Sequence, residues 1–433
     1  MPSGYPDPLV RSMISVIEDG LFFEFDELPM SHHEPDPETH LILAGPYRLF
    51  FPLGVLNGLL GVGHWALWSV GWIETSEPYF HASIQVQGFL ACFVVGFLMT
   101  ALPRFLGSTS STRLELSLVL LPALGFTFFS GQYQWKPAQA SFLVLLIALI
   151  PFVARRAAQR TKAPPASFLL VGFGLAHAFI GTTLVLWSDI GADSARLFSM
   201  GRQMLQVGFL LCLVMGIAGQ LAPFLTGHAG EPDVDPSKTP IRGSGRGAML
   251  FHAGTGALML GSFVLDPHAP AVAAWMRAIL VTLHLFWFGR IGRWIKTKAV
   301  HTFLFWISCW MIPVGLWSVA LFPHYRLAGV HLIFIGGFSL MIFCFGLLVV
   351  MSHGARAHLL NTRLIPLQIV GGCVLLAAAF RFIADVVSWQ QYKLWVHLSS
   401  GFWMVAALVW LFYVLPKLGP LTQLKVRPLK HTT

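Results

Sequence analysis

The sequence predicts an all-α polytopic membrane protein whose twelve transmembrane helices form three pseudo-symmetric four-helix units. Composition is the first indication, because 55% of the 433 residues are hydrophobic and only 11% are charged, whereas soluble domains carry about 25% charged residues. The second indication is a series of apolar runs of membrane-spanning length. The third is an internal repeat, since similar segments at fixed spacing are typical of duplicated units.

The predicted helices are the apolar runs that reach the roughly 20 residues needed to cross a bilayer at a rise of about 1.5 Å per residue. In chain order we expect them near residues 47–72, 80–103, 114–130, 138–157, 165–187, 196–226, 245–266, 270–296, 300–322, 324–352, 364–388 and 390–416.

Charge predicts the orientation of these helices. Lysine and arginine gather in the loops after even-numbered helices, so both termini are expected to be cytoplasmic. Residues 1–46 then form an acidic cytoplasmic N-terminal tail without a cleaved signal, and residues 417–433 form a basic cytoplasmic C-terminal tail. The net charge of +9 mostly reflects this bias, and it predicts contact with anionic membrane lipid and not with nucleic acid.

The repeat lies in the second, sixth and tenth helices. Residues 88–96 and 208–216 share a Gly-Phe-Leu-x-Cys start and a final glycine, and a third Gly-Phe pair occupies residues 337 and 338. A histidine stands six or seven residues before the first and third of these landmarks, at His81 and His331. The alternative explanation is close helix packing through small residues, which membrane helices commonly use.

Seven histidines lie inside the predicted helices, and imidazole is a common ligand of haem iron and of copper. One membrane histidine alone more often bonds to a neighbouring helix, so the prediction depends on histidines at matched depth. We expect His81 and His331 to be axial haem ligands and His284 to bind a second metal or to be a distal ligand. The further metal-ligand candidates are His177, His64 and His397, whereas His252 is expected to be structural.

Three arginines are predicted to form a layer near the outer ends of their helices. Arg202, Arg277 and Arg381 each lie six or seven residues from that end, where a charge needs partners. Arg381 has Asp385 one turn away, which allows a local ion pair, but the other two have no carboxylate within a turn. Because guanidinium groups bind carboxylates through paired hydrogen bonds, we interpret the three as a layer that faces haem propionates.

The five cysteines form no C-x-x-C-H motif, so covalent haem attachment is not supported. Any haem is therefore expected to be non-covalent and b-type. No nucleotide-binding, zinc-protease or nucleophile-elbow pattern occurs either.

The segment Phe80-His81-Ala82, the Gly88-Phe89 pair and residues 96–103 resemble the signature of the NnrS family. That signature starts with an aromatic residue followed by His-Ala-His-Glu, continues with Gly-Phe, and finishes with Gly-Phe-Leu-Leu-Thr-Ala-Val-Pro. Further matches are Pro223 with Thr226, residues 283–285, the stretch from His331 through residues 350–351 to His358, and Arg381.

The resemblance implies a twelve-helix bacterial inner-membrane protein that contains haem and copper and is linked to denitrification and nitric oxide stress. One departure concerns the metals, because Ser83 and Ile84 stand where the family has its second His and Glu. The helix layout also resembles the core subunit of haem-copper oxidases, in which the second and tenth helices supply two histidines to one haem.

These observations predict a haem-binding membrane protein, with copper as a second metal, that handles nitric oxide or another nitrogen oxide. Reduction, sequestration and electron transfer all stay open, as does the electron donor; as an enzyme it would be a haem-dependent oxidoreductase such as a nitric oxide reductase. One alternative is a proton-coupled or anion transporter that uses the intramembrane histidines and arginines. Another is a haem-free scaffold of a respiratory enzyme.

Overall fold

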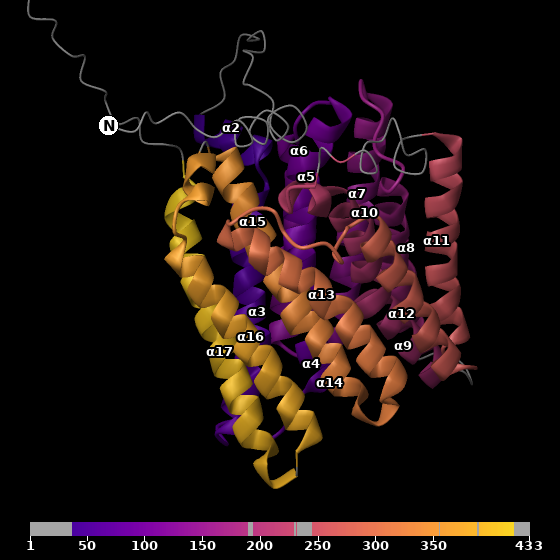
Figure 1. Ribbon diagram of the computed structural model, residues 1–433, viewed down its shortest axis with the longest axis vertical. Coiled ribbons are helices and arrows are strands. Elements are labelled where there is room, and N and C mark those ends of the chain that lie inside the picture. The colour runs from indigo at the N-terminus through magenta and orange to yellow at the C-terminus, as the bar shows by residue number, and fades with distance from the viewer. Residues whose placement is uncertain are drawn as a thin grey trace, which may run out of the picture.

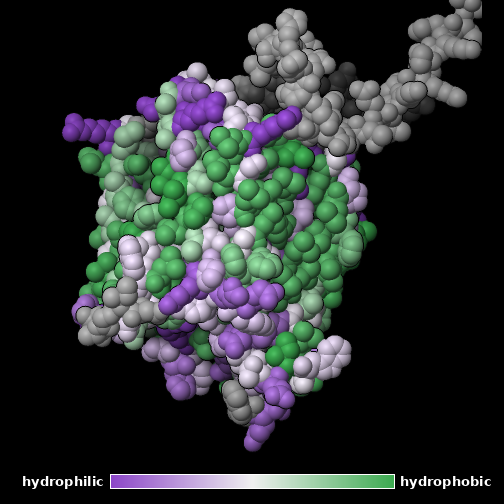
Figure 2. Space-filling view, turned by 180° about the vertical axis from the view of Figure 1, so that it is seen from behind, coloured by the Kyte–Doolittle hydropathy of each residue, from purple (hydrophilic) through white to green (hydrophobic). Residues whose placement is uncertain are grey.

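The computed structural model describes residues 37–188, 194–228, 231, 245–354, 356–387 and 389–419. Most of the predicted N-terminal tail and nearly all of the predicted C-terminal tail lie outside these residues. Among the described residues, twelve helical spans are long and apolar enough to cross a membrane, as predicted. On the face seen in Figure 2, apolar residues fill the middle of the molecule between two more polar ends. With its twelve candidate spans, the chain is a multi-pass integral membrane protein.

Nine of the twelve spans are single α-helices. Taken together with the other three, successive spans alternate in direction along the chain (Figure 1). A short helix, α2 (Pro37–Ala44), precedes them. The single-helix spans are α3 (Tyr47–Ser69), α6 (Arg113–Gly131), α7 (Trp135–Ala158), α8 (Phe168–Trp187), α11 (Arg246–Leu265), α12 (Pro270–Trp287), α13 (Val300–Leu321), α16 (Ile365–Val386) and α17 (Tyr392–Val414).

The second, sixth and tenth spans each contain a π-helical segment between two α-helices. They consist of α4 (Pro78–Ser83), π residues Ile84–Leu90 and α5 (Ala91–Leu106); of α9 (Ser194–Gln203), π residues Met204–Gly208 and α10 (Phe209–Leu225); and of α14 (Arg326–His331), π residues Leu332–Ser339 and α15 (Leu340–His353).

These three composite spans form the centre of the bundle. Between 78% and 83% of their most apolar windows is buried, compared with 50% or less for the other nine spans. We call the end of the bundle where α3 begins and α17 finishes the terminal end, and the opposite end the distal end (Figure 1).

The same helix contacts recur in the three parts of the chain. Each π-helical segment contains a glycine against which a side chain of the preceding span packs. A Cβ atom added to that glycine would lie only 2.4–3.0 Å from the packed side chain. The three pairs are Asn57 with Gly88, His177 with Gly208, and Met311 with Gly336. These contacts support the predicted three-unit arrangement.

The contacts also correct the register of the third copy. The π-helical segments start at Ile84, Met204 and Leu332, so the third copy follows the second by 128 residues, whereas the Gly-Phe pairs had suggested 129. The reason is that Gly336, not Gly337, occupies the contact made by Gly88 and Gly208. His331 therefore corresponds to Ser83, and the position of His81 corresponds to glycines in the other two copies.

One predicted helix is shorter than expected. The eighth span ends at Trp287 and not near residue 296. The helix cannot continue to residue 296, because Arg290 adopts a left-handed conformation with φ of 54°, which an α-helix does not accommodate. The indole N–H groups of Trp306 and Trp310 both donate to the Ile291 carbonyl, at 2.8 and 2.9 Å, and hold this turn against α13.

Candidate functional site

His81 is held at the distal end against the preceding span. Its Nδ1 lies 2.9 Å from the Gly61 carbonyl oxygen, and one turn further on the Gln85 amide donates to the Gly58 carbonyl at 2.8 Å. Because a carbonyl oxygen can only accept, Nδ1 carries the proton of the imidazole and Nε2 carries its lone pair. Metal-bound histidines in proteins are oriented in this way.

His331 has the same tautomer. Its Nδ1 donates to the carbonyl of Leu327 at 2.8 Å, which again leaves the lone pair on Nε2. Asp385 Oδ2 lies 3.9 Å from the same Nδ1. His81 and His331 lie within electrostatic range of Arg381, and His331 also lies within that range of His81.

The predicted local ion pair of Arg381 is present. Arg381 Nη1 lies 2.6 Å from Asp385 Oδ1, and both side chains are at least 88% buried. Arg381 Nη2 also donates to the Tyr392 hydroxyl at 3.3 Å. Sequence spacing identified Asp385 but gave no signal for Tyr392, which belongs to the next span.

His64 and His397 also lie at the distal end. The backbone N–H of Glu77 donates to His64 Nε2 at 3.0 Å, so His64 Nδ1 carries the proton and bonds to the Tyr133 hydroxyl at 3.2 Å. Both nitrogens of His64 are thus used within the protein. His397 Nδ1 lies 3.0 Å from Ser69 Oγ.

His177 and His284 contact a different set of helices. His177 Nδ1 donates to the Phe173 carbonyl at 2.7 Å, and its buried Nε2 has no hydrogen-bond partner. His284 Nε2 lies 2.9 Å from the Met215 carbonyl, and its ring is 5.7 Å from that of His252. Within the described ranges, no three His, Cys, Asp or Glu side chains form a group that could hold one metal ion.

Arg277 has a carboxylate partner that the sequence did not reveal. Its guanidinium bonds to Asp266, just beyond the end of α11, and lies 4.7 Å from the centroid of the Phe263 ring. Gln203 donates to the other oxygen of Asp266 at 2.6 Å and accepts from Arg326 at 2.9 Å. The sequence signal extended only one helical turn, and Asp266 is eleven residues away on another element.

Arg202 differs from the other two arginines of the predicted layer. It is half-buried, its Nε is enclosed without a hydrogen-bond partner, and no ion pair with a carboxylate is formed by it in the described part of the chain. Of the three arginines proposed to face propionates, Arg202 is therefore the one whose guanidinium is not paired with a carboxylate of the described residues.

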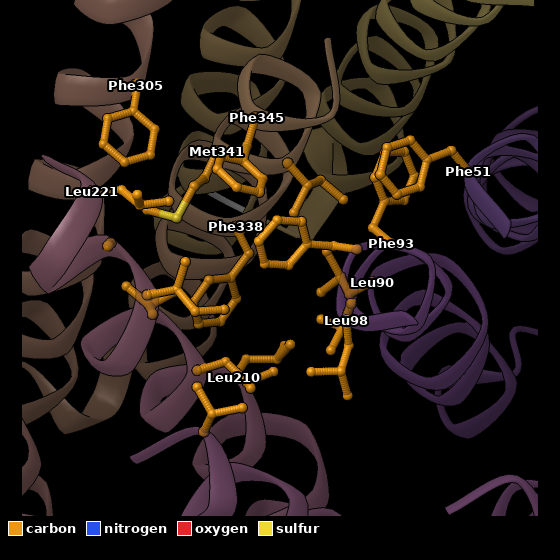
Figure 3. A pocket seen from close by; sticks show the side chains of 18 of the residues that line it. Phe51, Leu90, Phe93, Leu98, Leu210, Leu221, Phe305, Phe338, Met341 and Phe345 are labelled. Carbon is orange, nitrogen blue, oxygen red and sulfur yellow. The ribbon is translucent and has the colours of Figure 1, made fainter. Parts of the chain in front are cut away.

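An apolar cavity of about 100 Å³ lies between the three central spans (Figure 3). Each span lines it at matching positions of the repeat, offset by 120 and 128 residues. The matching sets are Leu90, Leu210 and Phe338; Phe93, Leu213 and Met341; Val94, Val214 and Ile342; and Phe97, Ile217 and Phe345.

A second apolar cavity, of about 220 Å³, adjoins the first. The two share lining residues such as Phe97, Val171 and Ile217. The second cavity continues between α5, α7 and α8 to Arg160 and Pro164, in the loop at the terminal end. The two apolar cavities together extend from the centre of the bundle toward its terminal end.

The twelve spans define a polytopic helical membrane protein that carries buried charged side chains near its distal end. The NnrS protein family model matches residues 41–420, nearly the whole chain. The chain therefore belongs to the NnrS family, as the motif around His81 had indicated. No curated protein matches it.

Proposed function

We propose that this NnrS-family protein binds haem between His81 and His331 and acts in the handling of nitric oxide or a related nitrogen oxide. The observation that carries the proposal is the matched state of the two imidazoles. Each donates Nδ1–H to a backbone carbonyl and so has its Nε2 lone pair available for iron.

The residues present fit a non-covalent haem. Two neutral histidines from different spans are a usual axial pair, and arginines are suitable partners for propionates. When bound, the haem would supply a redox-active iron that binds small gaseous ligands. His81 and His331 would hold it, and Arg202, with Arg381 less directly, would pair with its carboxylates. Copper, which the resemblance implies, stays a prediction, with His284 and His177 as candidate ligands.

The central cavity favours a small uncharged molecule as the ligand. Its lining is entirely apolar, so it is suited to a molecule that partitions into the bilayer and not to an ion. Nitric oxide has these properties.

The first prediction concerns the absorption spectrum of protein purified in detergent after expression with ample haem supply. We expect a Soret band with low-spin character, because two imidazoles give six-coordinate iron. His81→Ala and His331→Ala should each abolish the low-spin spectrum, since each removes one axial ligand.

His324→Ala is the matched control, because His324 is exposed at the same end of the bundle just before α14, and it should leave the spectrum unchanged. Wild-type protein without a Soret band would contradict haem binding. A low-spin spectrum that survives both alanine variants would contradict the ligand assignment alone.

A further inference from the structure

Four cationic side chains lie near one another at the terminal end of the bundle. Arg48 lies at the start of α3, Arg104 in the last turn of α5, Arg356 just after α15 and Lys417 just after α17. All four are half-buried. Within the described segments, none of the four forms an ion pair with a carboxylate.

Three of the four donate hydrogen bonds to carbonyl groups at the end of α17. Arg48 Nη1 bonds to the carbonyl of Leu418, Arg356 Nη1 donates to the carbonyl of Lys417 at 2.9 Å, and Lys417 Nζ donates to the Tyr413 carbonyl at 2.6 Å. These bonds satisfy carbonyls that a helix end leaves open. They do not neutralise the positive charges.

A buried hydroxyl lies among these charges without a partner. Tyr47 has an exposed fraction of 0%, and its hydroxyl has no hydrogen-bond partner. Arg48, Arg104 and Arg356 are all near enough to this hydroxyl to interact with it electrostatically. Arg48 Nε is likewise buried without a partner.

Half-buried like charges repel one another, and an unpaired buried donor is costly. An anion would relieve both costs. A phosphate group fits best, because guanidinium groups bind its oxygens in pairs and a tyrosine hydroxyl can donate to a third oxygen. The ends of four membrane spans converge here, at the level where lipid headgroups lie.

We propose that Arg48, Arg104, Arg356 and the Tyr47 hydroxyl form a binding site for the phosphate of an anionic phospholipid headgroup. Free inorganic phosphate shares the same chemistry and is distinguished by the experiment below. The site is separate from the histidines and does not depend on the proposed function.

The experiment titrates delipidated protein in neutral detergent with phosphatidylglycerol, phosphatidylcholine or inorganic phosphate. Bound lipid is counted by native mass spectrometry, and the thermal midpoint is recorded. We expect phosphatidylglycerol to bind and to raise the midpoint, whereas phosphatidylcholine should do neither. Arg104→Gln should weaken the binding of phosphatidylglycerol about tenfold or more, as expected for the loss of a charge-assisted hydrogen bond.

Arg113→Gln is the matched control, because Arg113 is exposed at the same end, and it should bind phosphatidylglycerol like the wild type. Tyr47→Phe is a second variant that keeps the ring and removes only the hydroxyl; it should weaken binding as well. Equal binding by wild type, Arg104→Gln and Tyr47→Phe would overturn the site. The lipid would be ruled out as the occupant of the site if inorganic phosphate shifted the thermal midpoint equally and also displaced phosphatidylglycerol.

Discussion

A histidine inside a membrane helix has two ring nitrogens, and the protein decides which of them can bind a metal. His81 and His331 each donate Nδ1–H to a carbonyl, whereas both nitrogens of His64 are used by Glu77 and Tyr133. The sequence could predict the presence and depth of these histidines from helical spacing. It could not predict their tautomers, because the partner carbonyl of His81 lies on a different span.

The arginines show the same limit. Arg381 and Asp385 are one turn apart, so their pairing could be predicted, and the structure confirms it. The pairing of Arg277 with Asp266 could not, because it depends on how α11 and α12 pack. A membrane charge without a local partner is therefore not evidence that a cofactor supplies one.

The second testable prediction follows from this pair. Asp266→Asn should destabilise the protein by roughly 3–5 kcal/mol, because it leaves the guanidinium of Arg277 buried without a counter-charge. Combining Asp266→Leu with Arg277→Met should cost much less, since no buried charge remains. Thermal unfolding in detergent measures both.

Arg155→Met is the comparison variant, since the Arg155 side chain is 44% exposed in its pair with Glu115 and should contribute less than about 1 kcal/mol. Strictly additive effects of the Asp266 and Arg277 substitutions would show that the two residues do not interact.

At the level of elements, the twelve spans could be predicted because apolar length is a strong signal. The π-helical segments could not be predicted. An inserted residue turns the following side chains to another direction, but it leaves the apolar composition of the span unchanged. Such segments are frequent at functional sites, and here each follows directly on a short helix. His81 and His331 belong to two of these short helices, α4 and α14.

Glycines fix how the spans pack beside these segments. A Cβ at Gly181 would lie 2.6 Å from the Gly201 carbonyl oxygen and 2.7 Å from the Leu205 nitrogen. Gly315 makes the matching contacts with Gly329 and Ile333. Backbone atoms cannot move aside as a side chain can, so these positions require glycine.

The third prediction is therefore that Gly181→Ala destabilises the protein by roughly 1–3 kcal/mol, as overpacking does. Gly172→Ala is a control on the same helix, because a Cβ there meets nothing within 4 Å, and it should be neutral or slightly stabilising. Thermal midpoints in one detergent give the comparison. Equal midpoints for the two variants would mean that α8 and α9 can separate at no cost.

At the scale of the whole molecule, the three central spans enclose the apolar cavity at matching positions (Figure 3). The sequence contained this pattern, because the residues that line the cavity recur at offsets of 120 and 128. Aligning the Gly-Phe pairs does not reveal it, because that alignment uses an offset of 129 residues between the second and third copies and so shifts the third copy by one residue.

The fourth prediction is that xenon binds saturably in this cavity, because dry apolar cavities accept it. The chemical shift of ¹²⁹Xe in detergent-solubilised protein measures binding. Ala218→Phe should reduce binding strongly, since Ala218 lines the cavity and the added ring would fill it; Val94→Phe is a second variant of the same kind.

Ala379→Phe adds the same ring on an exposed face of α16 and should leave xenon binding unchanged. If all three variants bind xenon like the wild type, the cavity is not the binding place. The result does not depend on haem, so it tests the cavity separately from the proposed haem ligands.

The shared starting register of the three π-helical segments has a historical consequence. A one-residue insertion that arose separately in each span would be expected at three different places, yet the segments begin at equivalent positions. If the units descend from one ancestor, the insertion preceded the duplications. His81 and His331 stand at different positions of the repeat, so these two histidines would have arisen after the copies diverged.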